Sequence, residues 1–138
     1  MLTRVAASLL CVLALAAPAT AGEKTPPPGT TVEMPYIIAP MTVDDKLVAY
    51  AYISPKIIAT SQSAAVDIRD KTPFLQDAFV RDVNGASIGT NGDPAKVDSA
   101  ALLARLLKEA RRIMGSGKVA SVGIVQIQIA QLRPASGS

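Results

Sequence analysis

Apolar residues recur with helical spacing in the middle of the chain. In the segment PFLQDAFVRDVNG, which begins at Pro73, they fall at i, i+3, i+4 and i+8: Leu75, Ala78, Phe79 and Val83. The preceding segment SQSAAVDIRD (61–70) also has the composition of a helix. Proline is tolerated in the first turn of a helix and disrupts its interior. We therefore expect Pro73 either to kink one long helix or to begin a second one.

The strongest helical pattern covers residues 98–114. Its apolar stripe consists of Leu102, Leu103, Leu106, Leu107, Ala110, Ile113 and Met114. Asp98 and Ser99 are suitable N-cap residues, and Gly115 and Gly117 end the pattern. For the two earlier helices the expected caps are Ser61 or Ser63, then Thr72, with Gly85 as a left-handed C-cap.

Three other segments have the composition of β-strands. Residues 32–40 are β-branched and aromatic, and Pro35 favours an edge position or a bulge there. Residues 46–60 form a second apolar run, which Pro55 interrupts, and residues 118–133 alternate between apolar and polar side chains. The order β–β–α–α–α–β predicts an α+β fold. We expect a small antiparallel sheet of three to four strands, packed against two or three helices, with the last strand pairing back into the sheet.

The strand over residues 46–53 is apolar on both faces. Its two sets are Leu47, Ala49, Ala51 and Ile53 on one face and Val48, Tyr50 and Tyr52 on the other. Such a strand is usually covered on both sides or borders a partner. This makes it a candidate contact surface.

The N-terminal segment predicts export from the cytoplasm. Arg4 precedes an apolar run from Val5 to Ala17, shorter than the ~20 residues that span a bilayer core. Ala19-Thr20-Ala21 follows and suits signal peptidase, so we expect a signal peptide over residues 1–21, cleaved before Gly22. The alternative is a retained inner-membrane anchor that faces the periplasm. The remaining divisions are a Pro-rich linker (22–31), one domain (32–133) and a disordered tail (134–138).

Composition excludes disulfides, cysteine metal ligands and histidine as a catalytic base from the chain that follows the predicted signal. Cys11 is the only cysteine and lies in the predicted signal, and the chain has no histidine and no tryptophan. The chain has 14 Lys+Arg against 11 Asp+Glu, and loss of Arg4 leaves 13 against 11, a net charge of +2. This small, mixed charge does not favour nucleic acid as a partner.

No catalytic or metal-binding motif is convincing. Ser54 and Lys56 lack an oriented third group, and the carboxylates Asp67, Asp70, Asp77 and Asp82 lie among cations on helical segments, as on a solvated face. Residues 82–93 begin like a calcium loop but lack its central glycine and its final glutamate. The sequence therefore predicts a protein that is not an enzyme and uses no cofactor or metal.

A second candidate contact surface is cationic. Arg105, Lys108, Arg111 and Arg112 lie away from the leucine stripe of residues 98–114. We expect these four side chains to face outward as one positive patch for an acidic partner surface.

The helix at Pro73 resembles the proline-led helix of FliL-type flagellar basal-body-associated proteins. The matching positions there are Pro73, Leu75, Asp77, Ala78 and Val80, and the terminal strand matches at Val119, Val122, Ile124, Ile127 and Gln128. The resemblance spans about residues 32 to 132. The chain differs from the family at DVNGASIG (82–89), which stands where the family has a Ser-Ser-Lys-Thr stretch.

The resemblance implies a stomatin-like periplasmic domain that modulates without catalysing. Its partners would be proteins of the periplasm or inner membrane, including the flagellar motor stator, and further copies of itself. The alternative is a soluble periplasmic binding or envelope-maintenance domain unrelated to flagella, since a fold does not decide its partner.

Overall fold

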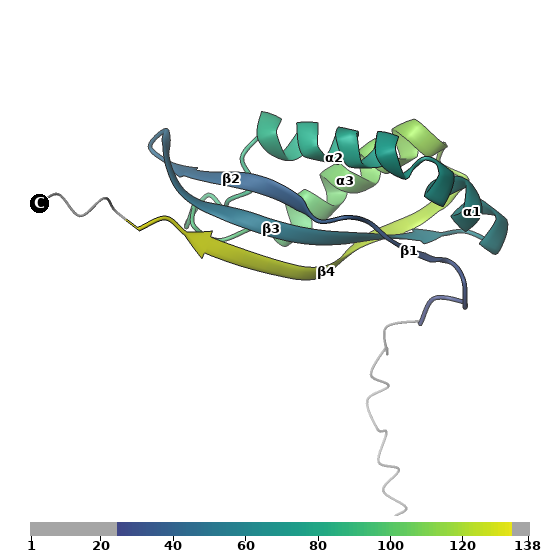
Figure 1. Cartoon of the computed structure of the whole chain (residues 1–138). Helices are drawn as coiled ribbons and strands as arrows, with labels where there is room; N and C mark the ends of the chain where they lie inside the picture. Colours follow the sequence, from purple (N-terminus) through teal and green to yellow (C-terminus); the bar gives the residue numbers. More distant parts are fainter. Residues whose placement is uncertain (1–24, 134–138) are drawn as a thin grey trace, which may run out of the picture.

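The computed structural model describes residues 25–133, which form one antiparallel sheet with three helices on it (Figure 1). This confirms the predicted α+β fold. The first predicted strand is in fact two strands, which Met34, Pro35 and Tyr36 separate. The elements are β1 (Thr31–Glu33), β2 (Ile37–Val43), β3 (Lys46–Ala59), α1 (Gln62–Asp70), α2 (Thr72–Gly85), α3 (Ser99–Met114) and β4 (Val119–Gln131).

The long strand β3 is the centre of the sheet. Along one side it pairs with β4, from Ala49 opposite Gln131 to Ala59 opposite Val119. Along its other side it pairs first with β2 and then with β1. The sheet therefore has two outer edges, one formed by β4 and the other by β1 and β2 in succession.

Pro55 does not interrupt β3, contrary to the expectation from sequence. It lies at a register shift between β3 and β4, where the ladder of hydrogen bonds is irregular. On the opposite side of β3 it lies next to the gap between β1 and β2, and its carbonyl accepts from the Met34 amide at 2.9 Å. A proline is tolerated inside a sheet at such a bulge, because no partner requires its missing N–H.

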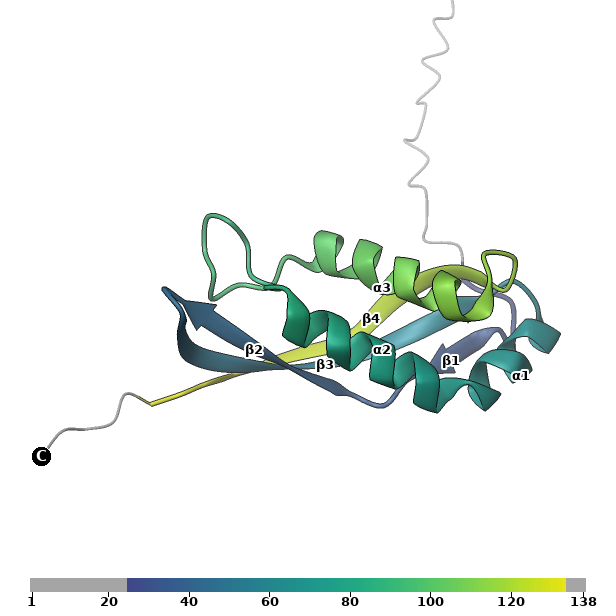
Figure 2. The same ribbon diagram turned by 90° about the horizontal axis from the view of Figure 1, so that it is seen from above.

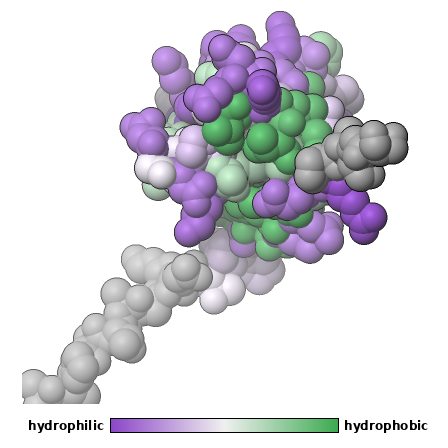
Figure 3. Space-filling view, turned by 90° about the vertical axis from the view of Figure 1, so that its left-hand side faces the viewer, coloured by the Kyte–Doolittle hydropathy of each residue, from purple (hydrophilic) through white to green (hydrophobic). Residues whose placement is uncertain are grey.

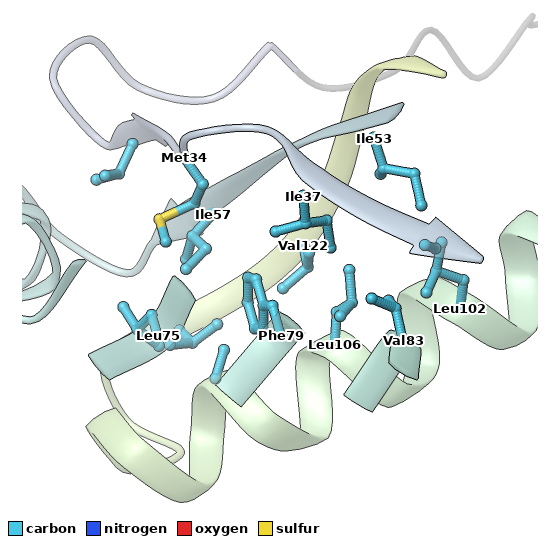
Figure 4. Packing of buried hydrophobic residues seen from close by; sticks show 14 of the residues in the cluster. Met34, Ile37, Ile53, Ile57, Leu75, Phe79, Val83, Leu102, Leu106 and Val122 are labelled. Carbon is cyan, nitrogen blue, oxygen red and sulfur yellow. The ribbon is translucent and has the colours of Figure 1, made fainter. Parts of the chain in front are cut away.

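All three helices lie on one face of the sheet, as the view from above shows (Figure 2). The side chains of β3 that point toward them are fully buried and small or β-branched, among them Ala49, Ala51, Ile53 and Ile57. Phe79 of α2 and Leu106 of α3 pack against this face within a single core (Figure 4). The leucine stripe predicted from sequence therefore faces the sheet at Leu102, Leu106 and Ala110.

Pro73 begins a second helix. α1 ends at Asp70, Lys71 is the residue between the helices, and the proline lies in the first turn of α2. Thr72 does not cap α2 as expected, because its hydroxyl donates back to the Ile68 carbonyl at 3.3 Å.

The other helix ends follow local chemistry. Ser61 accepts from the Ala64 amide and Asp98 from the Ala101 amide, as N-caps do. Gly115 ends α3 with a φ of 87°, but Gly85, the last residue of α2, is not left-handed, and Ala86 after it is in extended backbone.

The last residues of the predicted linker are attached to the domain. Thr30 is buried and donates to the Pro27 carbonyl, Gln62 of α1 donates to Pro28, and Thr31 already belongs to β1. The predicted signal peptide, its cleavage residues Ala19, Ala21 and Gly22, and the tail 134–138 lie outside the described residues. Across residues 25–133, no helix is both long enough and apolar enough to cross a membrane.

Candidate interaction surfaces

Arg105 of the predicted cationic patch connects α3 to the end of α2. Its guanidinium lies 2.8 Å from the Asp82 carboxylate, and the two side chains are only 27% and 19% exposed. It also donates to the backbone carbonyls of Asp82, Ala86 and Ser87. These four acceptors fix the C-terminal end of α2 and the loop after it. Arg105 is therefore structural, and its predicted place in an outward patch is wrong.

Arg111 points to a different side of α3. Its guanidinium donates to the carbonyls of Val119 and Ala120 at the start of β4, at 3.3 and 3.2 Å. Arg112 pairs with Glu109 on its own helix, and Lys108 is exposed. The structure therefore does not bring the four cations together as one patch. Lys108, Arg111 and Arg112 are exposed, and Arg105 is largely covered.

The residues weighed for catalysis lie in ordinary surroundings. Ser54 and Lys56 are on the same face of β3, but no hydrogen bond joins them in the part of the chain that the structure describes. The Lys56 side chain crosses Gly123 of β4, where a Cβ would lie 2.8 Å from the lysine Cε. Lys56 therefore covers part of the neighbouring strand.

The carboxylates considered earlier mostly have cationic partners. Asp77 pairs with Arg81, Asp67 with Lys118 at 2.9 Å, and Asp82 with Arg105. Among residues 25–133 no group of three or more metal-ligating side chains comes together. In the loop once compared with a calcium site, the Asp93 carboxylate accepts from the Ala95 amide within its own turn.

No other described element covers the face of the sheet opposite the helices. The side chains of Tyr50 and Tyr52 lie on this face, next to those of the β2 and β4 residues that pair with them. Tyr36, from the connection between β1 and β2, lies there too. Tyr36 and Tyr52 form a tilted pair with ring centroids 6.1 Å apart. They line a shallow hollow of about 220 Å³ together with Ser54, Gln126 and Gln128. The doubly apolar strand is thus covered on one side only.

The outer edge of β4 is a second open surface. Leu132 donates to the Val48 carbonyl, so in the alternating antiparallel ladder the backbone groups of Gln126, Gln128 and Ala130 point to β3. Those of Ile127, Ile129 and Gln131 then point outward. No other strand of the described chain pairs with this edge.

The two edges of the sheet differ in how well they are protected from pairing with another strand. On the β2 edge, the outward position between Ala39 and Met41 is occupied by Pro40, which has no N–H to offer. On the β4 edge, Arg111 covers the first carbonyls, as described above. Beyond them, residues 122–131 contain no proline and no charged residue. We call this segment the β4 edge.

Apolar side chains gather at the end of the molecule where β4 and the β2–β3 turn finish (Figure 3). Leu47, Ile129 and Leu132 are each more than a third exposed there. The sequence could indicate that these residues are apolar, but only the pairing of β4 with β3 brings them to the same end.

The chain matches no protein-family model, and no curated protein matches its sequence.

Proposed function

We propose that this protein is a non-catalytic, exported scaffold or modulator that acts through protein–protein contacts. The observation that carries the proposal is the β4 edge, ten residues without charge or proline whose outer side pairs with no other described strand. Natural proteins normally protect such an edge, because its free N–H and C=O groups pair with any extended chain that reaches them.

The contact would be made by strand addition. An extended segment of a partner lies along β4, and the outward groups of Ile127, Ile129 and Gln131 supply the backbone hydrogen bonds. Exposed Ile129 and Leu132 add apolar contact at the same end. The partner is a protein of the periplasm or inner membrane, or another copy of this chain.

The motifs shared with FliL-type proteins favour the flagellar motor stator as the setting of this contact. They lie in α2 and β4, the second of which carries the free edge. The alternative is a soluble periplasmic binding or envelope-maintenance domain. Co-purification from envelope extracts distinguishes the two, since only the first proposal requires stator components in the captured material.

A proline in the β4 edge tests strand addition. Ile129→Pro removes one outward N–H and leaves the hydrogen bonds to β3 intact, in the manner of Pro40 on the other edge. We expect the affinity for the partner, or for a second copy, to fall by roughly tenfold, because one backbone hydrogen bond is lost and the proline ring obstructs the approaching strand. Ile129→Val, which keeps the N–H, is the matched control. Equal capture by the two folded variants would refute the β4 edge as the contact.

A further inference from the structure

All three tyrosines of the chain lie together on the open face of the sheet. Tyr50 and Tyr52 come from β3, and Tyr36 joins them from the β1–β2 connection. Tyr36 is 60% exposed and Tyr52 36%. Aromatic rings without a cover offer large apolar contact area with a polar tip.

The hollow beside these rings has a uniform chemistry. Each of its five lining side chains, Tyr36, Tyr52, Ser54, Gln126 and Gln128, ends in a neutral group that both donates and accepts hydrogen bonds. From Val48 to Ser54, with the paired segments of β2 and β4, the strands contain no charged residue. A ligand for this face is therefore uncharged and rich in hydrogen-bonding groups.

We propose that this face binds a neutral glycan chain. A sugar ring presents apolar C–H surface to an aromatic ring, and its hydroxyl and acetamido groups match the hydroxyls and carboxamides of the hollow. No cation lines the hollow itself, and Lys56 on the same face lies over Gly123, so nucleic acid, whose affinity comes mainly from phosphate contacts, is disfavoured. A protein strand is better served by the β4 edge, where backbone groups are free. The glycan site shares Gln126 and Gln128 with the β4 edge, but it uses their side chains on the open face and not the outward backbone groups, so it does not depend on the proposed scaffold role.

The chain carries its own reporter for this face. It has no tryptophan, and its three tyrosines all lie here, so intrinsic tyrosine fluorescence reports selectively on the open face. Titration of the purified protein with chitohexaose, and separately with cellohexaose, is expected to change this fluorescence saturably with at least one of them. Binding of chitohexaose alone would assign the recognition to the acetamido groups.

Two variants test the assignment. Tyr52→Ala removes one ring of the pair, and Gln128→Ala removes an exposed carboxamide. Isothermal titration should show the affinity for the bound glycan falling by roughly tenfold or more in each. Phe74→Ala is the control, because Phe74 is as exposed as Tyr36 but lies on α2.

Three results would overturn the proposal. The first is no saturable change with either glycan at millimolar concentration, and the second is an equal loss of affinity in Phe74→Ala. The third is a concentration-dependent fluorescence change without any glycan that Tyr52→Ala abolishes. That last result would assign the face to a second copy of the chain.

Discussion

Arg105 is the side chain that joins α3 to the end of α2. It satisfies the Asp82 carboxylate and three carbonyls at once, in a position that is about three-quarters covered. Its sequence context indicates only a polar helix position. Its main partner is 23 residues away, and the packing of two helices decides that they meet.

Loss of Arg105 should therefore destabilise the protein. We expect Arg105→Ala to lower the free energy of unfolding by roughly 2–3 kcal/mol, since it leaves the half-buried Asp82 and its carbonyls without a donor. Arg112→Ala removes an exposed pair on one helix and should cost less than about 0.5 kcal/mol. Chemical denaturation of both variants gives the comparison. Equal stability losses would mean that the contacts of Arg105 carry no special weight.

At the scale of elements, periodicity predicts the helices and the final strand nearly to their ends. The α3 pattern works because that helix buries one face against the core, whereas β4 buries only Val119 and Val122 and is identified by its strand composition. The sequence could not show β3 running through Pro55, because that depends on a bulge against β4 and a gap between β1 and β2. Nor could it show which face of the doubly apolar strand stays open.

The buried stripe of α3 gives a prediction for the core. Leu106 is fully buried between the sheet and α2, so Leu106→Ala should cost roughly 2–5 kcal/mol through lost burial and a residual cavity. Val66→Ala, at an exposed site on α1, should change the stability by less than about 0.5 kcal/mol. Thermal unfolding measures both. A melting temperature that Leu106→Ala leaves unchanged would contradict the packing described for α3.

The whole molecule is asymmetric. Within residues 25–133, the helices cover one face of the sheet, Pro40 protects one edge, and the opposite face and the β4 edge are left open. Arg105 does not join the predicted cationic patch, and no other described element covers one face of the doubly apolar strand. Charge patterns on a helix do not indicate whether a cation will find a partner in the fold. Edge exposure follows from topology, which no local pattern encodes.

The central claim is that partners add a strand to the β4 edge, and residue-resolved hydrogen exchange tests it most directly. In the free protein, the amides of Gln128 and Ala130 should be protected by β3, and those of Ile127, Ile129 and Gln131 should exchange rapidly. In the partner-bound or self-associated protein, the three outward amides should become protected too. Protection gained around Lys108 and Arg112, with the outward amides of β4 still exchanging rapidly, would contradict the account.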